Sequence, residues 1–205
     1  MASASAPRTL PPGPGAPRSG HARAIRRSPI DRITAGFRAE FRRYQRVAES
    51  SLARLSDEAF FGDPGPDTNS VAILVKHIAG NLRSRWTDFL TTDGEKPDRD
   101  RDSEFVLEAG DTRAALMERW SVGWELLHAA LDGLADADLG RDVRLRGRTI
   151  AAGAAIAMQL AHAAYHAGQI VFVARMHSGS WESLSIPRGE SAVFFRHFRD
   201  KRGGA

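Results

Sequence analysis

The sequence of 205 residues contains no cysteine, only three lysines and only two tyrosines. Without cysteine the chain can form no disulfide, no thiolate nucleophile and no cysteine-ligated zinc site. A disulfide-free chain of this length favours a cytoplasmic location, although exported proteins can also lack cysteine. No apolar run approaches the roughly 20 residues that cross a bilayer, so we expect no membrane-spanning helix and no membrane partner.

The net charge of +4 suggests nucleic-acid binding, but its distribution along the chain argues against it. Residues 1–28 contain five arginines and no acidic residue, and the remaining 24 basic residues are balanced by 25 acidic ones. Nucleic-acid binding needs a concentrated basic surface that neutralises phosphates. We therefore expect no nucleic-acid partner.

Residues 1–28 consist mainly of Ala, Pro, Ser, Gly and Arg, with few side chains that a core could bury. This composition predicts a disordered tail. The segment also resembles an organelle transit peptide, and an extension translated from a GC-rich gene is the alternative that the 26 arginines favour. The rest of the chain, residues 29–200, has a suitable length for one domain.

Amphipathic periodicity predicts four helices and therefore an all-α bundle. Apolar residues recur every three or four positions over about 31–55, 69 or 70 to 90, 111 or 112 to before 140, and 149–177. The fourth segment is apolar nearly all round, so we expect it to be the most buried. Residues 141–146 alternate and predict a short extended piece, and the aromatic cluster at 194–198 predicts a lid or a dimer contact.

Two histidines in the fourth predicted helix suggest a metal site. His162 and His166 lie one helical turn apart, with Cβ atoms about 5–6 Å from each other, and two such imidazoles can reach one metal ion. His77, at the edge of the apolar stripe of the second helix, can supply a third nitrogen. A buried histidine is more often a hydrogen-bonded core residue, so the spacing alone leaves both interpretations open.

Several nearby residues are candidates for catalysis or binding. Ala163 follows His162, so the glutamate base of the zincin motif H-E-x-x-H is missing, which disfavours that type of peptidase. Tyr165 is a candidate proton donor, with a core aromatic as the alternative. Arg85 is a candidate for binding an anionic substrate, with a structural role as the alternative. Asn81 and Gln169 lie one turn beyond a histidine and could orient a ligand or a water, with a structural role as the alternative.

Several stretches in the same order resemble the DinB/YfiT-like superfamily, over about residues 30–199. They resemble above all its subgroup of short bacterial proteins that form a domain of unknown function. The stretches are VKHIAGNL at 75–82, residues 84–97 and 101–105, HAAYHAGQIV within 159–171, and SLSIPRG within 181–189. The resemblance implies an up-and-down four-helix bundle that is often dimeric. It also implies one divalent metal ion, zinc, nickel or iron, bound by His77, His162 and His166.

The resemblance further implies a reaction on a small-molecule substrate. Characterised members include thiol-dependent transferases and isomerases that use a low-molecular-weight thiol, whose pKa the metal is thought to lower. Others are assigned as metal-dependent hydrolases. We therefore expect a cytoplasmic, homodimeric metalloprotein that acts by thiol transfer or hydrolysis. The alternative is a non-catalytic bundle, stapled by its metal, that serves as a binding or stress-response module.

Overall fold

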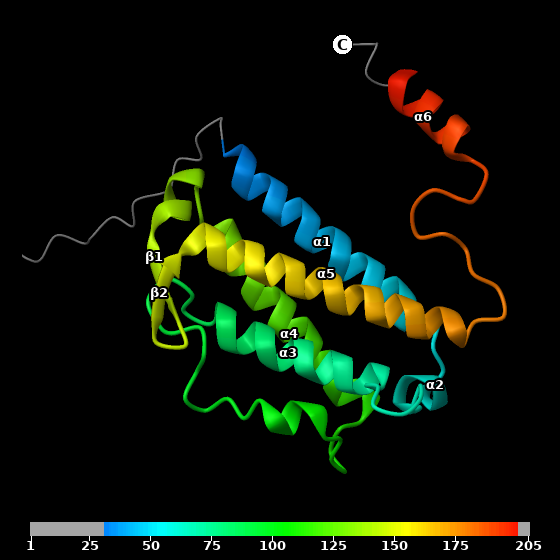
Figure 1. The fold of residues 1–205 in the computed structure, drawn as a ribbon, viewed down its shortest axis with the longest axis horizontal. Coiled ribbons are helices and arrows are strands. Elements are labelled where there is room, and N and C mark those ends of the chain that lie inside the picture. Colours follow the sequence, from blue (N-terminus) through cyan, green and yellow to red (C-terminus); the bar gives the residue numbers. More distant parts are fainter. Residues whose placement is uncertain (1–30, 201–205) are drawn as a thin grey trace, which may run out of the picture.

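The structure, a computed structural model, describes residues 31–200 and the side chains of residues 31–196. Four long helices form a bundle (Figure 1): α1 Arg32–Leu52, α3 Val71–Trp86, α4 Arg113–Asp132 and α5 Ala152–Met176. The predicted all-α four-helix bundle is thereby confirmed. The tail predicted for residues 1–28 lies outside the described residues.

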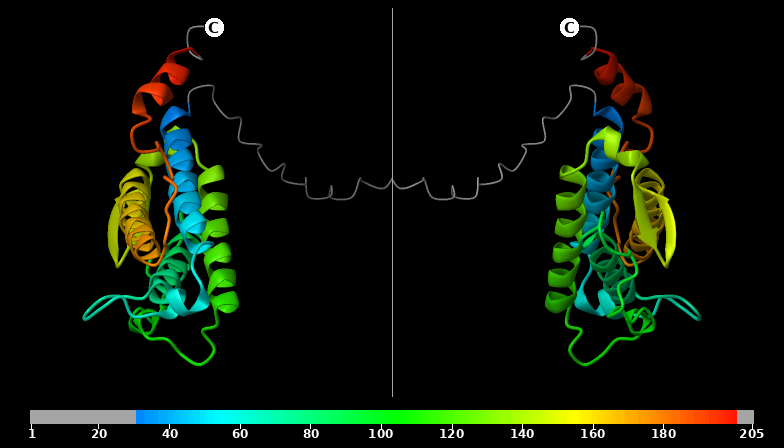
Figure 2. Two further views of the ribbon diagram at one scale, coloured as in Figure 1. Left: turned by 90° about the vertical axis from the view of Figure 1, so that its right-hand side faces the viewer. Right: turned by 90° about the vertical axis from the view of Figure 1, so that its left-hand side faces the viewer.

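The shorter elements connect or flank these helices. They are the helices α2 Asp57–Phe61 and α6 Ser191–Asp200, the single-turn helices η1 Asp102–Phe105 and η2 Asp136–Gly140, and the strands β1 Asp142–Leu145 and β2 Arg148–Ala151. The two strands pair antiparallel around Arg146 and Gly147, both with positive φ, and lie against α5 (Figure 2). The predicted extended piece at 141–146 is confirmed, and its partner strand occupies the first residues of the predicted fourth helix.

The four helices do not simply alternate in direction along the chain. Near the start of α3, the Nζ of Lys76 lies 2.7 Å from the carboxylate of Asp111, just before α4, so α3 and α4 run parallel. The long connection between them, residues 87–112, returns along the bundle (Figure 1). Near the start of α1, Arg38 donates a hydrogen bond to the carbonyl of Leu131 near the end of α4, so these two helices are antiparallel.

Helix ends and core positions follow the apolar pattern closely. The Ser70 hydroxyl accepts a hydrogen bond from the Ile73 backbone N–H, and the Thr112 hydroxyl accepts one from the Ala115 N–H. These two bonds cap α3 and α4 at the predicted starts of the helices. The core consists mainly of apolar side chains from all four helices. Fully buried among them are Phe41, Leu74, Ile78, Leu82, Leu116, Trp120, Leu127, Leu131, Ile156 and Ile170.

The expectation that the fourth predicted helix is the most buried was wrong. Twelve of the 16 residues of α3 are buried, against ten of the 25 in α5. One face of α5 exposes Met158, Tyr165, Phe172 and Met176. A helix at the outside of a four-helix bundle can bury only the face that its neighbours contact, so further apolar residues stay exposed. Among the described helices, none combines the length and the apolar character needed to cross a membrane.

The C-terminal helix α6 stands away from the bundle instead of covering it (Figure 1). Its side chains Val193 and Phe195 are more than half exposed. The structure therefore does not show α6 as a lid, and a dimer contact remains the other prediction for this cluster. The side chain of Phe198 lies outside the described part of the chain.

Candidate metal centre

The three predicted histidines meet between α3 and α5. The Nε2 atom of His162 lies 3.2 Å from Nε2 of His77 and 3.0 Å from Nε2 of His166. One ring nitrogen from each histidine can be chosen so that all three lie within 4.8 Å of one another. Nitrogens that share a tetrahedral metal ion through bonds of about 2.1 Å are about 3.4 Å apart. The spacing of the three imidazoles therefore fits a single cation.

Hydrogen bonds at the other ring nitrogen orient two of these imidazoles. His77 Nδ1 lies 2.8 Å from Oε2 of Glu104, and His166 Nδ1 lies 2.7 Å from Oε1 of Gln169. Both partner atoms are acceptors, so each Nδ1 carries a proton, and in the neutral ring this tautomer leaves Nε2 with a free lone pair. A carboxylate or carbonyl behind a histidine is the usual arrangement around a bound metal ion.

All three imidazoles are at least partly buried, and two of them lie in surroundings that disfavour protonation. His77 and His166 are buried, and the ring of Phe105 packs against His77 at a centroid distance of 4.7 Å. Burial, followed by the charges of neighbouring groups, lowers the pKa of His162 to about 3. Burial likewise lowers the pKa of His166. These two rings are therefore neutral at neutral pH, the state in which imidazole binds a metal.

Glu104 is a site residue that the sequence did not reveal. It lies in η1, where the charged connection between α3 and α4 looked like an ordinary exposed loop, and its side chain is buried. Arg99 binds both of its carboxylate oxygens, at 2.8 and 2.9 Å. Burial alone would raise the pKa of Glu104, but the hydrogen bonds from His77 and Arg99 outweigh it, so this pKa is lowered. Glu104 therefore stays ionised behind His77.

The glycine at position 80 gives Glu104 the space to approach α3. A Cβ atom at Gly80 would lie 2.8 Å from the Cδ atom of Glu104, closer than real Cβ contacts come. Gly80 follows His77 by one turn, so the helix can bring its backbone against the carboxylate that orients this histidine. A glycine inside a helix, next to a candidate ligand, was the available sequence signal for this contact.

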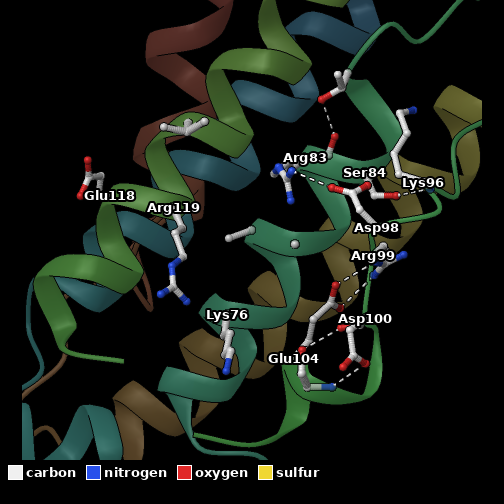
Figure 3. A pocket seen from close by; sticks show the side chains of 15 residues that line it. Lys76, Arg83, Ser84, Lys96, Asp98, Arg99, Asp100, Glu104, Glu118 and Arg119 are labelled. Carbon is white, nitrogen blue, oxygen red and sulfur yellow. Dashed lines mark hydrogen bonds and ion pairs between the residues drawn. The ribbon is translucent and has the colours of Figure 1, made fainter. Parts of the chain in front are cut away.

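A cleft with a volume of about 640 Å³ lies on the other side of Glu104, between α3, α4 and the connecting segment (Figure 3). Its charged side chains are largely paired with one another: Arg83 with Asp98 at 3.0 Å and Arg99 with Glu104 at 2.8 Å. Glu104 thus separates this cleft from the three histidines. The cleft is a neighbour of the candidate metal centre and does not contain it.

The other predicted site residues lie around the histidines. Gln169 bridges His166 and Tyr165, whose hydroxyl lies 3.3 Å from the Gln169 amide nitrogen. Tyr165 is 63% exposed, so the core-aromatic alternative is wrong for this residue. Asn81 is buried with no partner for its Oδ1 among the described residues, and Arg85 is half-buried two turns after His77. The catalytic and binding roles of these four residues stay predictions.

Comparison with known proteins yields one family. A family model described as "Protein of unknown function (DUF1572)" matches residues 32–190, which is most of the chain. No curated protein matches the sequence significantly.

Proposed function

The chain belongs to the DUF1572 family, within the DinB/YfiT-like superfamily, and we propose that it binds one divalent metal ion through His77, His162 and His166. The observation that carries this proposal is the convergence of three Nε2 atoms whose spacing fits one cation. The hydrogen bonds that His77 and His166 donate to Glu104 and Gln169 support it, because they hold two rings in the tautomer that a ligand needs. Zinc, nickel and iron all accept imidazole ligands.

We further propose that the protein is a small-molecule enzyme that acts by thiol transfer or by hydrolysis. A metal ion held by three imidazoles keeps a position for a water, a thiol or a substrate atom, and it lowers the pKa of the group that it binds. Because the chain has no cysteine, a thiol nucleophile has to come from a low-molecular-weight cosubstrate. Tyr165 is exposed next to Gln169, which suits a group that exchanges protons with solvent.

The second candidate function is a non-catalytic binding or stress-response module in which the metal ion cross-links α3 and α5 and has only a structural role. It is favoured by the direct contact of the three rings across these two helices. The two candidates differ in the coordination shell. An exchangeable water on the metal, detected by electron paramagnetic resonance of the cobalt-substituted protein, supports the enzyme, whereas a closed shell of four protein ligands supports the structural role.

We also propose a homodimer in the cytoplasm that binds no nucleic acid. The exposed apolar face of α5, with Met158, Tyr165 and Phe172, supports a contact between copies. The near balance of charges beyond residue 28 supports the absence of a nucleic-acid partner.

Elemental analysis of the purified chain tests the metal proposal. We expect about one metal ion per chain, largely lost in the His166→Ala variant, because two remaining imidazoles hold a cation much more weakly. The control is His177→Ala, which removes an exposed histidine at the end of the same helix. A wild-type chain without stoichiometric metal, or a His166→Ala variant that retains it, contradicts the proposal.

A further inference from the structure

A small cavity lies where the end of α3, the strand β1 and the first half of α5 meet. Arg85 and Trp86 of α3, Val143 and Arg144 of β1, and Gln159 of α5 line it. The space open to the centre of a water-sized group measures about 10 Å³, which admits one such group. None of the three histidines lines this cavity, which is therefore separate from the candidate metal centre.

Three of the lining side chains carry buried polar atoms without a partner. Trp86 is 3% exposed and Gln159 is 1% exposed. Among the described residues, no hydrogen-bond partner exists for Nε1 of Trp86, for the buried Nε of Arg85 or for either atom of the Gln159 amide group. Buried polar groups in folded proteins nearly always have a partner, and an unpaired one destabilises the fold. Unpaired atoms from three residues around one cavity therefore indicate a ligand.

The chemistry of these atoms favours an anion over a water molecule. Three of the four unpaired atoms are nitrogens that donate hydrogen bonds, and only Oε1 of Gln159 accepts. A water molecule accepts two hydrogen bonds and has two hydrogens of its own to donate. A monatomic anion only accepts, so it can pair with all three donors at once.

The charge of Arg85 also favours an anion. Among the residues that the structure describes, none forms an ion pair with Arg85. Glu95, whose charge acts on this guanidinium, lies 3.1 Å from both Arg99 and Arg146 and is paired with them. Burial, followed by the positive charges of Arg146 and Arg99, lowers the pKa of Arg85. Arg85 therefore lacks a counterion of its own.

Arg144 adds a second positive charge to the lining, and the nearby carboxylate of Asp93 offsets it in part. Hydrogen bonds from backbone N–H groups, led by that of Glu95, lower the pKa of Asp93, and the charge of Arg144 adds to this effect. Asp93 itself does not line the cavity. The lining thus contains two guanidinium groups and no carboxylate.

We propose that this cavity binds one chloride ion through the N–H groups of Arg85, Trp86 and Gln159. The ion supplies the acceptor that these donors lack and places a negative charge beside Arg85. Its size is close to that of a water molecule, whereas sulfate, phosphate and carboxylate groups have several heavy atoms and exceed the cavity. Because α3, β1 and α5 each contribute lining residues, the bound ion stabilises the packing of the β-hairpin against the two helices.

Nuclear magnetic resonance of the ¹⁵N-labelled full chain tests the proposal, with sodium chloride replacing sodium gluconate at constant ionic strength. We expect the indole N–H signal of Trp86 and the Nε–H signal of Arg85 to shift with chloride in a saturable way. Trp124 is the internal control, because its Nε1 is also buried without a partner among the described residues but it does not line the cavity. Its signal should stay in place, and sodium sulfate of equal ionic strength should shift none of the three signals.

Variants measured through the Trp86 signal locate the ion. Arg85→Met should weaken chloride binding about tenfold or more, and Gln159→Leu, which keeps the charge, should weaken it several-fold. The matched control Arg83→Met removes an exposed, ion-paired arginine of the same helix and should bind chloride like the wild type. His166→Ala should also bind chloride unchanged, because none of the three donors belongs to a proposed metal ligand.

A Trp86 signal that does not respond to chloride would mean that a water fills the cavity, and it would overturn the proposal. A response of equal size at Trp124 would overturn it by revealing a general salt effect. A response that persists at full strength in both Arg85→Met and Gln159→Leu, or one that disappears in His166→Ala, would place the ion elsewhere and overturn it as well.

Discussion

At the scale of single residues, the three histidines differ in how firmly their rings are held. His77 is fixed by the Glu104 carboxylate, which Arg99 holds in turn, and His166 is fixed by the Gln169 amide. No described residue holds Nδ1 of His162, whose ring is also the more accessible. A metal ion would therefore meet two imidazoles in fixed orientations, those of His77 and His166, and one that can adjust, that of His162. The strength of binding should then depend on the group behind His77 as much as on the ligands themselves.

Replacing Glu104 by Gln tests this dependence with a minimal change of shape. The neutral amide is a weaker acceptor for the His77 Nδ1–H and leaves the buried Arg99 without its full counterion, so we expect metal affinity to fall about 10–100-fold. Competition with a chromogenic chelator measures the affinity. Glu118→Gln, an exposed glutamate that lines the neighbouring cleft, is the control and should bind metal like the wild type. Equal affinities for the two variants would show that Glu104 does not act through His77.

At the scale of helices and strands, the start of α1 depends on a residue a hundred positions away. The backbone N–H groups of Thr34 and Ile33 donate to the Asp136 carboxylate at 2.8 and 3.1 Å. The N-cap residue Asp31 makes no side-chain capping bond. The hydrogen bond from the Thr34 backbone is the main cause that lowers the pKa of Asp136. Asp136 thus takes the place of the local N-cap of this helix.

Replacing Asp136 by Ala should lower the midpoint of thermal unfolding at pH 7. A lowered folded-state pKa means that ionised Asp136 stabilises the fold above its unfolded pKa of 3.8, and that this contribution disappears as pH falls through the lower folded value. The difference in midpoint between wild type and variant should therefore be constant above about pH 5 and shrink below pH 4. Thermal scans over this range measure it. Asp102→Ala, at a fully exposed aspartate, should show no such difference.

How much of the structure could be predicted depends on how far apart in the sequence the interacting residues lie. Local periodicity predicted the starts of α3 and α4 to within two residues, and the spacing of His162 and His166 depends only on helix geometry. The direction of α4 and the contacts of Glu104 and Asp136 depend on the path of the chain between distant elements. Their partners lie 27 and 102 positions away in the sequence, and a local sequence pattern cannot predict a contact across such a separation. The third candidate ligand, His77, could be identified only from the packing of α3 against α5.

At the scale of the whole molecule, the exposed side of α5 is the face on which the proposed contact between two copies rests. Met158, Tyr165, Phe172 and Met176 recur at helical spacing and are each more than half exposed. Residues between them are small, including Ala161 and Gly168, so a second helix could approach closely. The face also carries Tyr165, which hydrogen-bonds to the amide group behind His166. Association through α5 would therefore shield one side of the candidate site.

Replacing Phe172 by Glu tests this association. We expect the wild-type chain to elute with a mass about twice its 22.4 kDa and the variant to elute as a monomer, because a carboxylate buried in an apolar contact loses its hydration without a partner. Size-exclusion chromatography with light scattering measures both masses. Val122→Glu, at an exposed apolar residue of α4, should leave the dimer intact. A monomeric wild type, or a dimeric Phe172→Glu variant, would mean that this face of α5 does not join two copies. The candidate metal centre would then be open to solvent on the α5 side of a single bundle.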